Sequence, residues 1–181
     1  MQDLSLHILD IIENSINAGA KRVEIMINED LEKDILSIEI KDNGEGIDRE
    51  TLEKVLDPFY TTRTTRRVGL GLSLLSQSAK EAEGDISIKS EKGVGTAVHA
   101  YFKHSHIDRR PLGNIADTIF VLIAGNPGID FYYKHKKNDK AYSIDTREIR
   151  AELGDVPLNS PEVIKIIRKD IEEGLREIGR V

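Results

Sequence analysis

The sequence predicts an α/β protein, a two-layer sandwich in which helices cover a mixed β-sheet. Residues 3–17 carry leucine and isoleucine three and four positions apart, which is the period of an amphipathic helix. Residues 22–28 and 35–42 instead alternate apolar and polar side chains, as strands with one buried face do. Helical and strand-like segments follow one another in the order α-β-β-α-loop-α-β-β, and elements in this order can segregate into two layers.

Turn and cap residues mark the boundaries of these elements. Gly19 ends the first helix, and acidic turn residues join the strands at 22–28 and 35–42 into a hairpin. Asp48 is a candidate N-cap for a short helix at 48–56. The other elements expected in this part are a loop at 57–68, a helix at 69–84, and strands at 85–90 and 96–102.

The character of the chain changes after residue 104. A polar joint containing Pro111 follows, and Ser160-Pro161 has the pattern of a helix start. We therefore predict two domains, residues 1–104 and a smaller α+β extension at 105–181 whose role is unknown. The elements expected in the extension are helices at 113–124, at 146–153 and from 161 onward, with strands at 129–135 and 141–145.

Composition excludes several classes of function. The formal net charge of -6 and the pI near 5.4 do not support a nucleic-acid-binding surface. The absence of cysteine excludes disulfides and thiolate metal sites. The sequence has no basic leader before an apolar run, and no stretch long enough for a membrane helix. We expect a cytoplasmic protein that binds neither nucleic acid nor membrane.

A first polar block lies on the first helix. Asp10, Asn14 and Asn17 are spaced four and three residues apart and so share one face. Asparagine is a mediocre helix former, so two of them on one face need a reason. A solvated polar face is one explanation. The other is a cation site, because amide oxygens suit a hard ion such as Mg²⁺.

A second block, Asp42-Asn-Gly-Glu-Gly46, comes directly after a strand. A carboxylate at a strand end can accept the exocyclic amino group of adenine. Gly44 and Gly46 would let the backbone approach a flat base closely. A tight turn explains the same residues without any ligand.

Two further blocks have residues suited to phosphate. In the third, Phe59 can anchor a loop whose arginines, Arg63 among them, suit phosphate oxygens, although a solvated basic loop has the same composition. In the fourth, Gly69-Leu-Gly71-Leu72 opens a helix, where free N–H groups form an anion site. No Gly-Lys-Ser/Thr is present, so this is not a Walker loop.

In this order, and followed by the turn Gly93-Val-Gly95-Thr96, the blocks closely resemble the GHKL superfamily. This superfamily comprises the ATP-binding domains of gyrase, the heat-shock chaperone, sensor histidine kinases and the mismatch-repair ATPase. The resemblance covers roughly residues 3–103. It implies a Bergerat-type ATP-binding fold with ATP and Mg²⁺ as cofactors.

The resemblance also implies a role for individual residues. Asn14 would hold Mg²⁺ against the triphosphate, Asp42 would pair with adenine, and Thr96 would assist Asp42. Residues 60–68 would form a lid over the nucleotide. The other nucleotide-binding residues implied are Asn17, Gly44, Gly46, Ile47, Phe59, Thr62, Arg63, Gly69, Leu70, Gly71 and Leu72.

Asp10 is the candidate catalytic residue. In the ATP-hydrolysing branches a glutamate four residues before the metal-binding asparagine activates water, and many histidine kinases have asparagine there. Asp10 occupies this position with a shorter carboxylate that can still act as a base. Our hypothesis is that Asp10 orients water or a substrate hydroxyl for attack on the γ-phosphate.

The resemblance leaves the reaction open. Arg67 replaces a glycine that is usual in the lid, and only nine residues precede Asp10, so we expect no phosphoacceptor helix. Three functions fit: a stand-alone protein kinase, an ATPase whose cycle drives a conformational change or homodimerisation, and a non-catalytic module in which nucleotide controls binding of an unidentified protein partner.

Overall fold

The computed structural model describes residues 3–55 and 71–179, and within them six strands form one mixed sheet in the order β3-β4-β2-β1-β5-β6. All neighbouring strands pair antiparallel except β1 and β5, which are parallel. The strands are β1 (Arg22–Asp30), β2 (Ile35–Asp42), β3 (Asp85–Glu91), β4 (Gly95–Lys103), β5 (Asp130–Lys137) and β6 (Lys140–Asp145).

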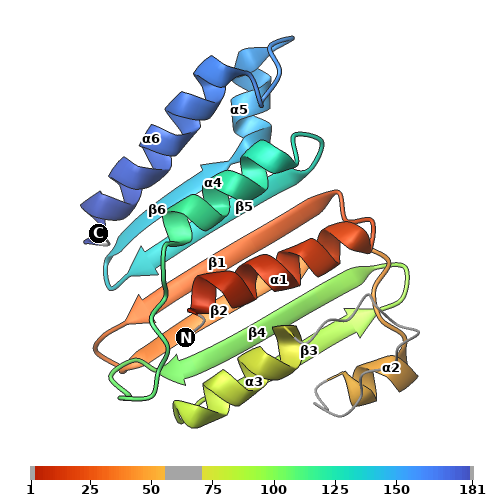
Figure 1. The fold of residues 1–181 in the computed structure, drawn as a ribbon, viewed down its shortest axis with the longest axis vertical. Helices are drawn as coiled ribbons and strands as arrows, with labels where there is room; N and C mark the ends of the chain where they lie inside the picture. The colour runs from red at the N-terminus through yellow and green to blue at the C-terminus, as the bar shows by residue number, and fades with distance from the viewer. Residues whose placement is uncertain (1–2, 56–70, 180–181) are drawn as a thin grey trace.

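Helices cover one face of this sheet. Figure 1 shows α1, α3 and α4 lying over the sheet, roughly along the strand direction, with α6 extending the helical layer beyond α4. The predicted two-layer α/β sandwich is therefore confirmed. The helices are α1 (Leu4–Asn17), α2 (Arg49–Lys54), α3 (Gly71–Glu81), α4 (Ile115–Gly125), α5 (Thr146–Leu153) and α6 (Pro161–Glu177).

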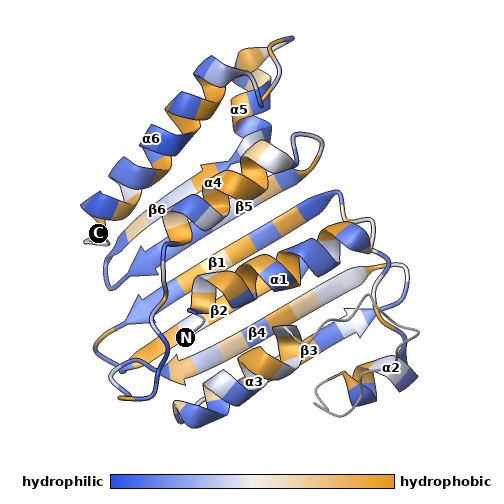
Figure 2. Cartoon of the chain, in the orientation of Figure 1, coloured by the Kyte–Doolittle hydropathy of each residue, from blue (hydrophilic) through white to orange (hydrophobic). Residues whose placement is uncertain are grey.

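The core lies between the sheet and the helical layer. Every second residue of β1 is buried, including Val23, Ile25 and Ile27, because side chains alternate between the two faces of a strand. Ile8 and Ile12 of α1 are fully buried on the same side. Figure 2 shows apolar residues concentrated on α1, α4 and the central strands. Each buried isoleucine contributes roughly 1.5–3 kcal/mol.

Two helix starts follow the sequence signals. Asp48 caps α2, since its carboxylate accepts the backbone N–H of Thr51 at 2.9 Å. Ser160 occupies the N-cap position of α6 ahead of Pro161, but its hydroxyl makes no capping hydrogen bond. No helix in the described ranges has the length and apolar character needed to cross a membrane.

The extension continues the sheet of the first part. β5 pairs with β1 from Arg22↔Asp130 to Glu29↔Lys137, so the sheet runs across the boundary predicted at residue 104. The joint before α4 lies against α1, where Pro111 accepts the backbone N–H of Leu4 at 2.9 Å. The division into two domains stays a prediction.

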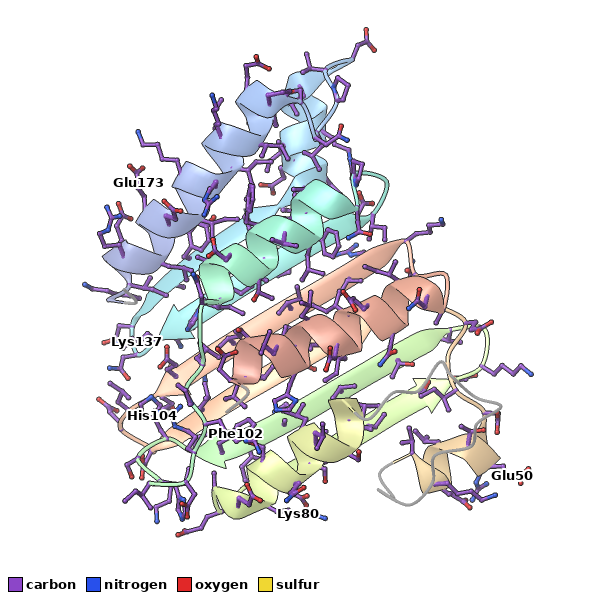
Figure 3. All side chains as sticks on the ribbon, viewed as in Figure 1. Glu50, Lys80, Phe102, His104, Lys137 and Glu173 are labelled. Atoms are coloured by element: carbon purple, nitrogen blue, oxygen red, sulfur yellow. The ribbon has the colours of Figure 1, made fainter. Side chains whose placement is uncertain are left out.

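A closed polar cluster joins the two parts of the chain at one end of the sheet. Glu29 of β1 is 3% exposed, and its Oε1 lies 2.8 Å from Nε2 of His135 on β5. Its Oε2 lies 3.2 Å from Nε2 of His104 in the joint. The hydroxyl of Tyr133 is 2.8 Å from Nδ1 of His135. We call these four residues the Glu29 cluster. Figure 3 shows His104 at the end of the sheet opposite α2, which carries Glu50.

Candidate functional site

A pocket opens between α1, the first turn of α3 and the adjoining ends of β2 and β4. We call it the α1–β2 pocket. It brings together residues from three of the four sequence blocks and from the start of β4. The predicted residues that line it are Asn14, Asp42, Gly46, Ile47, Leu72 and Thr96.

Asp42 ends β2 and presents its carboxylate at the pocket. Its Oδ1 accepts the backbone N–H of Gly44 at 2.9 Å, and its Oδ2 accepts the hydroxyl of Ser15 at 2.6 Å. An ionised carboxylate has about four acceptor positions on its two oxygens, so these two donors leave capacity for a ligand. Gly44 itself is buried and does not line the pocket. Its contribution to this geometry is the N–H that it donates.

Thr96 lies beside Asp42 because the two residues are partners in the β2–β4 ladder. Its hydroxyl is 2.8 Å from the hydroxyl of Ser90 on β3. Ser90 also accepts the backbone N–H of Ile47 at 2.8 Å and donates to the carbonyl of Gly95 at 3.0 Å. Ser90 therefore links Thr96 of β4 to Ile47 in the loop after β2, and both of these residues line the pocket. No sequence motif singles out Ser90, and its only signal is its place in the strand that precedes Thr96.

Glycine is required at two positions around the pocket because backbones approach there. Gly46 has φ +69°, and a Cβ on it would lie 2.1 Å from the carbonyl oxygen of Glu91. Gly95 has φ +140°, and a Cβ there would lie 2.0 Å from the carbonyl oxygen of Asp42. Side chains rarely adopt these conformations, and both sites lack room for one. These glycines allow the loop and the strands to pack closely.

Asp10 lies one helical turn before Asn14, next to the start of α3. A Cβ on Gly71 would lie 3.1 Å from the Cβ of Asp10, so Gly71 lies directly beside the Asp10 side chain. Asp10 is exposed, and Gly71 is buried as the first residue of α3. The fold thus places a carboxylate beside a helix N-terminus, where free N–H groups favour anions.

Asn17 is not brought into the pocket. Three residues of helix turn it about 60° away from Asn14. It lines a separate groove between α1 and α4, together with Glu13 and Val121. Five other predicted residues lie outside the described residues: Phe59, Thr62, Arg63, Gly69 and Leu70.

The remaining lining of the pocket is mostly apolar. Ile11 and Ala18 of α1 face Ile40 of β2 and Val98 of β4 across it. Apolar walls with a carboxylate acceptor among the lining residues suit an aromatic base that carries an amino group. Asn14 is half-buried at the pocket, and its amide oxygen is a fitting ligand for Mg²⁺, which otherwise keeps waters and phosphate oxygens.

A second cavity lies away from these residues. It measures 420 Å³, against 90 Å³ for the α1–β2 pocket among the described residues. It lies between the start of α4 and α6 and is lined by Asn114, Glu172 and Arg176 among others. None of the predicted residues lines it. Because the converging polar groups, and not the volume, indicate a binding site, we assign the site to the α1–β2 pocket.

Solved structures resemble the fold over almost the whole chain. The N-terminal domain of a DNA repair protein has a TM-score of 0.60 and 19% identity, with 97% of this chain and 59% of that chain covered. The MutL ATPase domain of Aquifex aeolicus complexed with ADP has a TM-score of 0.52 and 17% identity, with 96% and 70% covered. At these identities the likeness is one of fold.

Two sequence relatives each match about half of this chain, and the matched segment is less than a fifth of each relative's length. A putative sensor protein of Shewanella frigidimarina is 36% identical over 103 residues, which is 56% of this chain and 16% of the relative. A probable C4-dicarboxylate sensor kinase of Halalkalibacterium halodurans is 35% identical over 105 residues, with 55% and 19% covered. Residues 2–106 match the family described as histidine kinase-, DNA gyrase B-, and HSP90-like ATPase. This match spans more than half of the chain, which therefore belongs to that ATPase family.

Proposed function

We propose that the chain binds ATP in the α1–β2 pocket, together with Mg²⁺, and that it hydrolyses or transfers the γ-phosphate. The observation that carries this proposal is the Asp42 carboxylate. Two donors of the protein hold it, one on each oxygen, and it borders a pocket with apolar walls. Membership of the ATPase family supports the same reading.

The carboxylate accounts for the choice of base. Adenine carries an amino group at position 6, which can donate a hydrogen bond to Asp42. Guanine carries a carbonyl oxygen at the same position. This oxygen accepts hydrogen bonds and would face the Asp42 carboxylate, which is also an acceptor. A site that leaves a polar group without its partner discriminates strongly against the wrong ligand. Thr96 offers a hydroxyl beside Asp42 for a further contact with the base, directly or through water.

The phosphates would extend from the base along α1 towards the start of α3. Asn14 would hold Mg²⁺, whose charge would offset that of the phosphate oxygens. Gly71 and the first N–H groups of α3 would face the phosphates. Phe59, Thr62, Arg63, Gly69 and Leu70 remain predicted contributors to the lid and to phosphate binding.

Asp10 is the proposed base because it lies beside the start of α3, next to this phosphate path. It would accept the proton of a water or of a protein hydroxyl as that oxygen attacks the γ-phosphorus, the bond to the β–γ bridging oxygen breaks and ADP leaves. One relative is named a probable sensor kinase, which supports transfer of the phosphate to a separate protein partner. We expect this reaction to take place in the cytoplasm, and the chain to act with or without homodimerisation. A non-catalytic nucleotide-controlled module is the alternative, and it requires no role for Asp10.

Two measurements on the whole chain test this proposal. Isothermal titration should give a dissociation constant for Mg-ATP well below that for Mg-GTP, and removal of Mg²⁺ should weaken ATP binding. Incubation with γ-labelled ATP should then release free phosphate or label an added protein, and Asp10→Asn should suppress either product while ATP still binds. Equal affinity for ATP and GTP would contradict the assigned base site. Unchanged turnover in Asp10→Asn would remove Asp10 from the reaction.

A further inference from the structure

Ser15 is a buried residue of α1 whose hydroxyl reaches a different element of the fold. It is 6% exposed, and its Oγ lies 2.6 Å from Oδ2 of Asp42, which is 27 residues further along the chain. The contact joins the helix wall of the α1–β2 pocket to the end of β2. Ser15 also lines the pocket itself.

The hydroxyl of Ser15 has two acceptors within reach. The carbonyl oxygen of Ile11 lies 3.2 Å away, one turn back in the same helix. A serine hydroxyl carries one proton and can satisfy only one of them fully. The contact with Asp42 is shorter, and a bond to an ionised oxygen is about twice as strong as a neutral one. The proton therefore goes to Asp42.

This bond complements the one from the backbone of Gly44. The N–H of Gly44 holds Oδ1 at 2.9 Å and the hydroxyl of Ser15 holds Oδ2, so each oxygen has one fixed donor. Two donors on different elements fix the plane of the carboxylate. Both oxygens act as acceptors in these bonds, so a ligand group that faces their remaining lone pairs must be a donor.

We propose that Ser15 is a positioning residue for base recognition, which orients Asp42 so that the pocket prefers a purine with a 6-amino group. This inference rests on the proposed ATP site and adds to it a residue that sets specificity. Ser15 acts through Asp42 and does not itself contact the reacting phosphate.

A packing role for Ser15 makes a different prediction from a positioning role. If Ser15 only packs α1 against β2, its loss weakens every nucleotide alike. If it orients Asp42, its loss weakens only ligands that use the carboxylate. Purine riboside triphosphate separates the two cases, because it has the shape and phosphates of ATP without the 6-amino group.

The test is isothermal titration of the wild-type chain and Ser15→Ala with Mg-ATP and Mg-purine riboside triphosphate. We expect Ser15→Ala to weaken ATP about tenfold, the scale of one lost contact to a charged group, and to change binding of the analogue by less than twofold. Ser15→Thr keeps the hydroxyl and should recover most of the affinity for ATP. Ser78→Ala is the matched control, since Ser78 is a fully buried serine of α3 that does not line the pocket.

Each outcome decides between the alternatives. Equal losses for both ligands in Ser15→Ala, or no loss for ATP, would overturn the positioning role while leaving the ATP site intact. A failure of the wild-type chain to bind ATP would overturn the proposed function and this inference together. A circular dichroism spectrum and a melting curve for each variant establish that the comparison is made between folded proteins.

Discussion

The buried carboxylate of Glu29 and the half-buried carboxylate of Asp42 lie on neighbouring strands but have different surroundings. Glu29 lies near the end of β1, and Asp42 is the last residue of β2. The strands are antiparallel, so these residues occupy opposite ends of the sheet. Protein side chains contact both oxygens of Glu29 in the Glu29 cluster. Asp42 has one donor on each oxygen and borders a pocket.

The difference teaches how one chemical group serves two purposes. A carboxylate enclosed by its partners serves the fold, because its removal would leave those partners without their hydrogen bonds. A carboxylate that is oriented but keeps acceptor capacity towards a pocket is available to a ligand. This comparison predicts that changes at Glu29 affect stability with little effect on ATP binding, and that changes at Asp42 do the reverse.

The largest expected effect is on stability, at Glu29. Glu29→Ala leaves His135 and His104 without their partner carboxylate. Each group left unsatisfied costs about 1–3 kcal/mol, so we expect a loss of about 3–4 kcal/mol in stability. Urea unfolding should show this loss. The affinity of the folded variant for Mg-ATP should stay within about twofold of wild type, because Glu29 lies at the opposite end of the sheet from Asp42. A variant that keeps full stability, or that loses ATP binding while folded, would break the comparison.

The reverse effect is expected at Asp42. Asp42→Asn replaces one acceptor oxygen by an NH₂ group, which can only donate. This group would face another donor, either the 6-amino group of adenine or one of the present donors to Asp42, Ser15 and Gly44. ATP affinity should fall about 100-fold, or about 2.7 kcal/mol. The unfolding free energy should change by less than about 1 kcal/mol, since Asp42 is partly solvated. Titration calorimetry and urea unfolding measure both quantities, and a stability loss larger than that of Glu29→Ala would contradict the assignment.

A smaller effect tests the packing around the pocket. Gly46→Ala places a methyl group 2.1 Å from the carbonyl oxygen of Glu91, in addition to an unfavourable φ of +69°. We expect a loss of about 2 kcal/mol in stability and weaker ATP binding. Gly93→Ala is the control, because Gly93 has φ +83° but no atom within 4 Å of the added Cβ. The two variants should differ by the clash alone, and equal losses would refute the close approach at Gly46.

The smallest expected effect is on the pH dependence of stability, through His7 of α1. Burial first, and then the charge of Arg110, lower the pKa of His7, while Asp10 and Asp3 raise it in part. The unfolded chain therefore takes up this proton before the folded chain does. Stability should fall as pH drops through the ordinary histidine value of 6.5 towards the lower folded value.

His7→Leu removes this proton uptake. Its unfolding free energy should decline less than that of wild type between pH 7.5 and pH 5.5, as measured by urea unfolding at each pH. A variant with the same decline as wild type would show that His7 does not contribute to it.

The sequence predicted best what local periodicity determines. The boundaries of α1, β2 and α5 follow from apolar spacing and from turn residues, and the cap at Asp48 from a single residue type. It did not predict that β5 pairs parallel with β1, because the partner of a strand depends on the path of the chain through α4 and not on the pattern of the strand. The continuous six-stranded sheet of the described residues became visible only in three dimensions.

Some residues of the predicted site come together in the structure, and others do not. Asn14, Asp42 and Thr96 stand in recognisable blocks, and the structure brings them to one pocket. Ser15 and Ser90 were missed, since serine is common and their contacts depend on helix rotation and strand register. Asn17 was included because of its spacing, but the helix turns it towards a different groove.

The most direct test of the account is a crystal structure of the chain with a non-hydrolysable ATP analogue and Mg²⁺. The account predicts the base in the α1–β2 pocket, with the 6-amino nitrogen about 3 Å from the Asp42 carboxylate and with Ser15 still bonded to that carboxylate. The phosphates should run past Asn14 towards Gly71. A base bound elsewhere, or one whose amino group lies beyond hydrogen-bonding distance of Asp42, would contradict it.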